Sequence, residues 1–147
     1  MSQARQDWRI RPFEMRDYDL VRALWSSAGE GVTLRPSDEP AEINKKLTRD
    51  PELFLVAETP VGVVGVIMGA WDGRRGWLHH LAVARDHRAQ GIGTALVMAV
   101  EEGLRAKGCL KINLLVARSN LDAQRLYRRL GYDTMTGFMG MGKELLP

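Results

Sequence analysis

A glycine-bearing turn, Arg88-Ala89-Gln90-Gly91-Ile92-Gly93-Thr94, follows an apolar run from Trp77 to Val83 and opens a helix-like run from Thr94 to Lys107. Strand, turn and helix in this order form a cradle for an anion. The turn and the start of the helix present unpaired N–H groups and the positive end of the helix dipole. Glycine lets a phosphate approach the main chain because no Cβ obstructs it, and Arg88 adds positive charge. We therefore predict a phosphate-bearing ligand at this turn.

The spacing of the glycines excludes two common phosphate-binding motifs. A P-loop needs Gly-Lys followed by Ser or Thr, which this chain lacks. The dinucleotide fingerprint GxGxxG needs a third glycine at the position of Leu96. The remaining pattern, Arg-x-x-Gly-x-Gly, resembles the pyrophosphate loop of the GCN5-related N-acetyltransferases (GNAT), which bind acetyl-CoA.

Composition limits the class of protein further. The chain has 147 residues, 45% of them hydrophobic, which suits one domain with a buried core. Its net charge of +3 is compatible with a polyanionic cofactor and too small to argue for nucleic acid. The single cysteine, Cys109, fits a reducing cytoplasm. The longest apolar run, Val61 to Trp71, is shorter than the ~20 residues of a membrane helix. We predict a cytoplasmic protein with no membrane segment.

The periodicity of apolar residues and the turn signals predict an order of elements. Strands are expected at Trp8–Pro12, Leu53–Thr59, Val63–Trp71, Trp77–Val83, Lys111–Val116, Tyr132–Thr134 and Phe138–Leu145, and helices at Asp17–Ala28, Glu42–Asp50, Thr94–Lys107 and Asn120–Leu130. The order β-α-α-β-β-β-α-β-α-β-β is an α/β fold with a mixed sheet. The helix between the fourth and fifth strands makes those two strands parallel.

A second pattern runs from Asn120 to Tyr132. Asn120 is a good N-cap, and the apolar residues recur at i, i+3, i+4 and i+7, so they share one face of a helix. The residues Asn-x-x-Ala-x-x-Leu-Tyr-x-x-Leu-Gly-Tyr resemble the last motif of the same GNAT family. They follow the glycine turn at the expected distance. The resemblance covers roughly Trp8 to Leu145, in outline only for the first 50 residues, and implies a single GNAT-like domain over 1–147 with the acyl-CoA N-acyltransferase fold.

The resemblance implies that an acetyl group moves from acetyl-CoA to a primary amine of an unidentified acceptor by direct attack. In the family the cofactor lies between the fourth and fifth strands. The backbone from Arg88 to Thr94 then holds the pyrophosphate. Val83, with Ala82 beside it, pairs with the pantetheine arm like an added strand, and the N–H of Leu81 faces the thioester oxygen. Asn120 either contacts the pantetheine arm or caps its helix.

The resemblance also makes Tyr127 the general acid. A phenol with a pKa near ~10 protonates a thiolate whose thiol has a pKa near ~8.5 only slightly uphill. From its place on an apolar helix face alone, Tyr127 would be a core residue.

The general base is harder to assign. Relatives carry a glutamate where this chain has Trp77 or Leu115. The fourth strand offers His79 and His80 instead, and a neutral imidazole accepts a proton at pH 7. Strict alternation places His79 on the face of Trp77 and Leu81, with His80 opposite. Arylalkylamine-type relatives resemble this chain in carrying a histidine at the position of His79, so we favour His79 over His80. A bulge next to the active site would change this alternation.

Two other functions remain open at this point. The missing carboxylates are compatible with a non-catalytic module that binds or senses acyl-CoA. Four arginines of the last part of the chain, Arg118, Arg125, Arg128 and Arg129, fit a nucleic-acid-binding domain, but the small net charge and the glycine turn argue against it, and we expect no nucleic-acid partner. No metal site is predicted. Pairing of relatives through their last strands suggests a possible homodimer.

Overall fold

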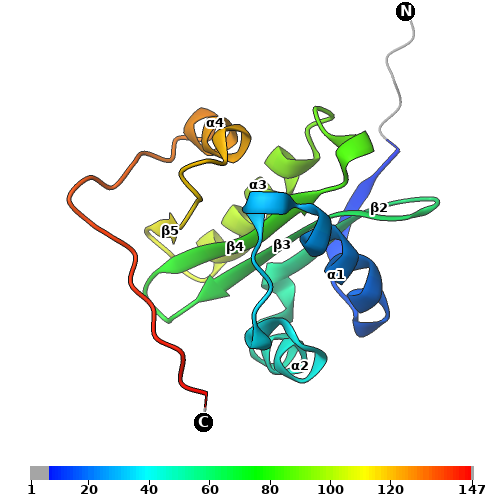
Figure 1. Ribbon diagram of the computed structural model, residues 1–147, viewed down its shortest axis with the longest axis horizontal. Helices are drawn as coiled ribbons and strands as arrows, with labels where there is room; N and C mark the ends of the chain where they lie inside the picture. The colour runs from blue at the N-terminus through cyan, green and yellow to red at the C-terminus, as the bar shows by residue number, and fades with distance from the viewer. Residues whose placement is uncertain (1–6, 147) are drawn as a thin grey trace, which may run out of the picture.

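The computed structural model describes residues 7–146, which build a twisted five-stranded sheet with helices on both faces (Figure 1). The strands lie in chain order across the sheet: β1 (Arg9–Pro12), β2 (Phe54–Thr59), β3 (Gly62–Trp71), β4 (Gly76–Val83) and β5 (Ile112–Leu114). The first four pair antiparallel and β4 pairs with β5 in parallel. The predicted mixed sheet and the predicted parallel pair are both confirmed.

Two pairs of helices enclose the sheet. Helices α1 (Tyr18–Ser27) and α2 (Pro40–Arg49) pack on one face, and α3 (Ile92–Ala106) and α4 (Leu121–Arg129) belong to the other (Figure 1). Short 3-10 turns connect them at Met15–Asp17, Gly29–Gly31, Pro36–Asp38, Pro51–Leu53 and Arg85–His87. Helix α2 begins two residues before the predicted Glu42 because proline suits the first turn of a helix.

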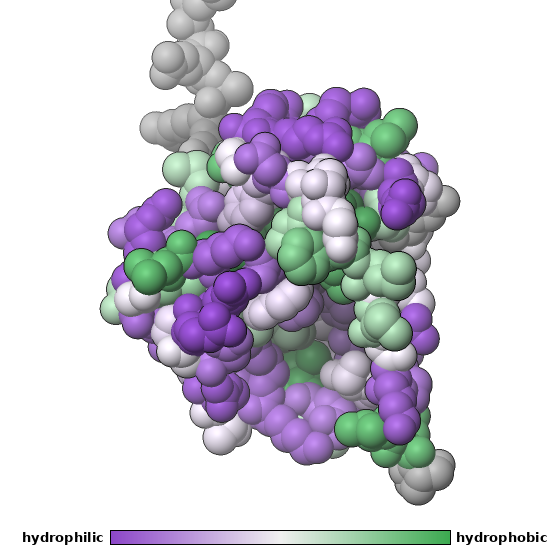
Figure 2. Space-filling model, turned by 90° about the vertical axis from the view of Figure 1, so that its left-hand side faces the viewer, coloured by the Kyte–Doolittle hydropathy of each residue, from purple (hydrophilic) through white to green (hydrophobic). Residues whose placement is uncertain are grey.

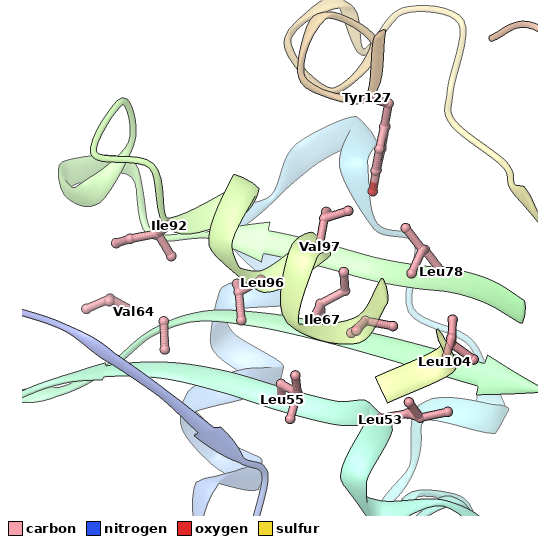
Figure 3. Close-up of a cluster of buried hydrophobic side chains, with 12 residues drawn as sticks. Leu53, Leu55, Val64, Ile67, Leu78, Ile92, Leu96, Val97, Leu104 and Tyr127 are labelled. Carbon is pink, nitrogen blue, oxygen red and sulfur yellow. The ribbon is translucent and has the colours of Figure 1, made fainter. Parts of the chain in front are cut away.

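The core beneath α3 follows from the helical period of its apolar residues. Ile92, Leu96, Val97, Val100 and Leu104 are each at most 1% exposed. They meet buried leucine, isoleucine and valine side chains of the central strands (Figure 3). Burying each such side chain stabilises the fold by about 1.5–3 kcal/mol.

A glycine of β3 lets α3 approach the sheet closely. A Cβ at Gly69 would stand 2.5 Å from Cγ1 of Val100 and 3.2 Å from the main-chain oxygen of Leu53. Any larger side chain would therefore push the helix away from the strand.

The core beneath α1 is built around aromatic rings. Trp25 and Phe54 are fully buried, and their ring centroids lie 6.3 Å apart. Phe13 packs against Phe54 at 4.2 Å. This core anchors α1 beside β4, where Trp25 also meets a candidate site residue.

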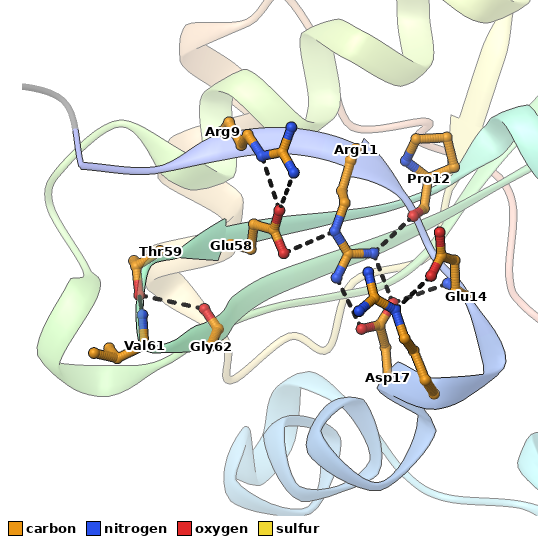
Figure 4. A network of polar contacts seen from close by, with 10 residues as sticks. Arg9, Arg11, Pro12, Glu14, Asp17, Glu58, Thr59, Val61 and Gly62 are labelled. Atoms are coloured by element: carbon orange, nitrogen blue, oxygen red, sulfur yellow. Dashed lines mark hydrogen bonds and ion pairs between the residues drawn. The ribbon is translucent and has the colours of Figure 1, made fainter.

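An ion-pair network joins β1, β2 and the start of α1. The Arg11 guanidinium donates two hydrogen bonds of 2.8 Å to the carboxylate of Asp17 and lies 2.8 Å from Glu58 (Figure 4). Asp17 is 4% exposed and also accepts the N–H of Glu14 at 2.9 Å. Because each oxygen of Asp17 has a donor, its charge is tolerated inside the fold.

The prediction of strands at Tyr132–Thr134 and Phe138–Leu145 is wrong for this structure. Both segments run without strand pairing, and the side chains of Phe138, Met139 and Met141 are at least 80% exposed. Gly140 and Gly142 alternate with the methionines, so one face of this segment offers almost no side chain to pack. The neighbouring edge is also short, because β5 spans three residues rather than the predicted Lys111–Val116.

Candidate active site

The glycine turn has the geometry of an anion-binding loop. Gly91 (φ +84°) precedes the first residue of α3, and Ala89 (φ +62°) also lies in the left-handed region. Where residues with left-handed and right-handed backbone conformations follow one another, their main-chain N–H groups point into one shared concavity. Helix α3 begins at Ile92, two residues before the predicted Thr94, so the N–H groups of its first turn face the same concavity. The predicted glycine turn ahead of a helix is therefore confirmed.

The end of β4 is open on the side away from β3. Strand β5 pairs only with Gly76–Leu78, so β4 has no partner strand there beyond Leu78. The N–H of Ala84 donates to the oxygen of Val64 at 2.7 Å, toward β3. Because N–H direction alternates along a strand, the N–H groups of Val83 and Leu81 point to the open edge. The Nε of Arg88 donates to the Val83 oxygen at 3.2 Å, which ties the turn to this edge.

A β-bulge interrupts β4 between His79 and Ala82. Met68 of β3 faces His79, whereas Val66 faces Ala82, so His80 and Leu81 together oppose the single residue Ile67. His80 takes the left-handed conformation, with φ +54°. A bulge of this kind adds a residue on one strand and reverses the alternation beyond it.

The bulge corrects the predicted faces of β4. His79 shares a face with Trp77, as predicted, and their rings stack with centroids 6.3 Å apart and planes 5° apart. Leu81 packs against the core of α3 instead. His80 does not point the other way: its ring meets Trp25 of α1 edge-on, with centroids 5.1 Å apart. Both histidines therefore lie on the α1 and α2 face.

The two histidines have different surroundings. His79 is exposed. Partial desolvation of its ring, with the neighbouring His80 and Lys46, lowers its pKa below the ordinary 6.5. His80 Nε2 lies 2.9 Å from Oδ1 of Asp38, which is 6% exposed. Burial alone would raise the pKa of Asp38, but hydrogen bonds from His80 and from the N–H of Arg35 lower it below its ordinary value.

Tyr127 extends from α4 toward β4, and its hydroxyl ends near Val97 and Leu78 (Figure 3). Its side chain is 8% exposed, and desolvation raises its pKa to about 12. Within residues 7–146 its hydroxyl has no hydrogen-bond partner. The ring packs edge-on against Tyr132, whose own hydroxyl donates to Glu101 at 2.8 Å. Tyr127 is thus a core residue with a free hydroxyl.

Asn120 caps α4, because its Oδ1 accepts the N–H of Ala123 at 3.2 Å. Beside it, α4, β5 and the chain from Tyr132 to Met141 surround a groove of about 1650 Å³ that Tyr127 and Trp77 help to line. Figure 2 shows this side of the molecule hollowed, with apolar surface at the floor of the recess. A long, partly apolar ligand has space in this groove, which follows β5 and reaches β4 only at Trp77.

The described helices include none with the length and apolarity that a membrane crossing requires.

Known proteins resemble this chain over most of its length. Residues 17–132 match the model of the acetyltransferase (GNAT) family. An acetyltransferase of Sodalis glossinidius is 41% identical over 138 residues, covering 93% of this chain and 95% of the relative. An uncharacterized N-acetyltransferase of Yersinia pestis is 40% identical over the same shares.

Solved structures share the fold. Ard1 from Thermoplasma volcanium superposes with a TM-score of 0.75 at 26% identity, over 86% of this chain and 82% of that one. The PaiA N-acetyltransferase from Thermoplasma acidophilum, solved in complex with coenzyme A, gives a TM-score of 0.74 at 20% identity, over 87% and 91% of the two chains.

Proposed function

The chain belongs to the GNAT acetyltransferase family, and from this premise we propose that it transfers the acetyl group of acetyl-CoA to a primary amine by direct attack in a ternary complex. The observation that carries the proposal is one continuous site. A concavity of main-chain N–H groups at the start of α3 adjoins the open edge of β4, and the phenol of Tyr127 approaches that edge from α4.

The main chain fits a long phosphorylated thioester. The N–H groups from Arg88 to Thr94 would hold the pyrophosphate, helped by the positive end of α3. The N–H of Val83, which points to the open edge, would pair with the pantetheine arm, whereas its neighbour Ala82 pairs with Val66 of β3. The N–H of Leu81 would face the thioester oxygen, where a well-placed donor in other enzymes contributes about 3–4 kcal/mol to the transition state. Acetyl-CoA supplies the activated acetyl group.

Tyr127 would protonate the departing thiolate. With a pKa of about 12, its phenol is fully protonated at neutral pH. The desolvation that weakens this acid also raises the proton affinity of a thiolate formed beside it. The transfer is therefore less uphill than the raised pKa of Tyr127 alone suggests. The hydroxyl of Tyr127 has no hydrogen-bond partner in the described residues, and a tyrosine that only filled the core would not need this hydroxyl.

A histidine of β4 would take the proton of the attacking amine. His79 and His80 lie on the face that α1, α2 and their connecting loop cover, so this face is the acceptor side. The lowered pKa of His79 keeps its imidazole neutral at pH 7. A histidine could therefore serve as the base in place of the glutamates that relatives carry where this chain has Trp77 and Leu115.

The absence of these glutamates favours one other function, that of a module that binds acyl-CoA without catalysing a reaction. The two functions are separated by CoA release, followed with a thiol reagent, in the presence of a diamine, an amino acid or a peptide with a free N-terminus. Amine-dependent release supports the transferase. Tight acetyl-CoA binding without release for any amine would favour the binding module.

Tyr127→Phe tests the assignment of the acid. We expect kcat to fall on the order of 100-fold, the usual size of general acid catalysis, with an unchanged Kd for acetyl-CoA. Tyr132→Phe is the matched control, because it removes the hydroxyl of the other ring in the pair and leaves the packing. Equal turnover of Tyr127→Phe and wild type would remove Tyr127 from the mechanism.

A further inference from the structure

A buried carboxylate reaches one of the β4 histidines from 42 residues away in the chain. Asp38 ends the 3-10 turn Pro36–Asp38 in the loop between α1 and α2. Its Oδ1 lies 2.9 Å from Nε2 of His80. The side chain of Asp38 is 8% exposed and that of His80 25%, so the pair is enclosed on the carboxylate side and reachable on the imidazole side.

Asp38 itself is held on both sides. Its Oδ2 accepts the N–H of Arg35 at 3.0 Å, and its main-chain oxygen accepts the hydroxyl of Tyr18 at 2.8 Å. These contacts come from the loop and from α1. These bonds fix the orientation of the Asp38 carboxylate, so that only its Oδ1 faces His80.

His80 is held at its main chain as well. The indole Nε1 of Trp25 donates to the His80 oxygen at 3.2 Å, and the indole ring lies edge-on to the imidazole. Trp25 is fully buried. The left-handed φ of His80, which is unfavourable for a residue with a Cβ, is thus held in place by Trp25 and Asp38. The bulge at His80 therefore places this histidine, like His79, on the face of the sheet where the acceptor amine would bind.

The ionised carboxylate selects one form of the imidazole. A carboxylate only accepts hydrogen bonds, so the neutral ring must carry its hydrogen on Nε2 and leave Nδ1 with a lone pair. We propose that Asp38 is a positioning residue that holds His80 as the Nε2–H tautomer and thereby makes Nδ1 of His80 the base for the attacking amine. A base oriented by a third group recurs among enzymes that activate nucleophiles.

This proton transfer rests on the proposed function and is one part of a balanced acetyl transfer. The amine nitrogen forms a bond to the acetyl carbon, and its proton passes to Nδ1 of His80. The carbon–sulfur bond breaks, and the thiolate takes the proton of Tyr127. The imidazolium formed at His80 lies against the carboxylate of Asp38, which stabilises it. His79 has no carboxylate hydrogen bond among the described residues, so Asp38 acts on it only through the longer-range attraction of its charge.

The tautomer is tested without turnover. Long-range ¹H–¹⁵N spectra of protein with labelled histidine separate the two neutral tautomers, and His80→Gln assigns the signal. We expect wild-type His80 to be almost entirely Nε2–H and Asp38→Asn to lose this preference. Glu58→Gln is the matched control, because it neutralises a carboxylate whose ion-pair partners, Arg9 and Arg11, belong to β1, and its His80 signal stays unchanged. A wild-type mixture of tautomers would overturn the proposal.

Turnover supplies the second test. With acetyl-CoA and an accepted amine, we expect Asp38→Asn and His80→Gln to lower kcat at least 10-fold with the KM for acetyl-CoA within twofold. Asp38→Glu, which keeps a carboxylate, restores part of both the tautomer and the rate. A larger loss in His79→Gln than in His80→Gln would contradict the assignment of the base. Absence of amine-dependent turnover in wild type would instead contradict the proposed function, and the spectra still decide the role of Asp38.

Discussion

Asp17 and Asp38 are both almost fully buried, and each is compensated by a group from a distant part of the chain. Arg11 of β1 neutralises Asp17, and His80 of β4 contacts Asp38. The first pair serves stability, since it joins β1 to the start of α1 far from the open edge of β4. The second lies at the acceptor side of the proposed site. The same residue type therefore has two different roles, which are set by the partner.

Asp17→Asn should lower the free energy of unfolding by about 1–3 kcal/mol at pH 7, because it removes one of the two carboxylates that pair with the partly buried Arg11. Burial alone would raise the pKa of Asp17, but its bonds to Arg11 and to the N–H of Glu14 lower it. The contribution of Asp17 is therefore complete above the unfolded pKa near 3.8 and disappears as the pH falls through the lower folded pKa.

Chemical denaturation of both proteins at a series of pH values measures this difference. The gap between wild type and Asp17→Asn should narrow only below about pH 4. A gap that stayed constant down to pH 2, or that was absent at pH 7, would show that the ion pair does not stabilise the fold as described.

Sequence alone predicts the residues of the site better than their orientation. The glycine turn, Tyr127 and the two histidines all lie around one edge of β4. The orientation of His80 was predicted wrongly because a period of two holds only in a strand without a bulge. Asp38 was not assigned a role because its contact with His80 spans 42 residues of the chain, which no local pattern predicts. The flanking Pro36 and Pro40 were the one local signal of an ordered turn.

Among the elements, α3 and β3 depend most closely on each other. Gly69→Ala places a methyl group 2.5 Å from Val100 and 3.2 Å from the main chain of Leu53. We expect a loss of about 1–3 kcal/mol in the free energy of unfolding, as for other overpacked cores. Gly142→Ala is the control, because nothing lies within 4 Å of a Cβ there.

Urea denaturation at neutral pH compares the two alanine variants. Equal midpoints for Gly69→Ala and Gly142→Ala would mean that α3 moves freely away from the sheet. In that case the packing of α3 on the sheet would not fix the position of the glycine turn beside β4.

The elements with strong periodicity were predicted within two residues at most of their ends, whereas the C-terminal strands were not found. Helix α3 buries a full apolar face, and α1 and α4 pack most of their apolar residues against the sheet, so pattern and packing agree. Phe138 to Leu145 has the alternation of a strand but places glycines on one face. Local pattern predicts an element only where a partner surface is available to bury it.

At the scale of the whole molecule, the proposed function assigns a different substrate to each face of the sheet. The α3 and α4 side carries the glycine turn, the proposed pyrophosphate site, and Tyr127, and the α1 and α2 side carries the histidines and the loop of Asp38. A thioester laid along the open edge of β4 would be accessible from both sides. The predicted cytoplasmic location and the possible homodimer stay predictions.

Calorimetric titration of the full chain with acetyl-CoA tests the central claim most directly, with ATP and NAD as competing phosphate ligands and Gly91→Trp as the blocked variant. Gly91 has φ +84°, so a tryptophan there is strained and obstructs the turn. We expect selective binding of acetyl-CoA with a Kd in the micromolar range, which Gly91→Trp loses while keeping its fold. A well-folded wild-type protein that failed to bind acetyl-CoA would contradict the central claim.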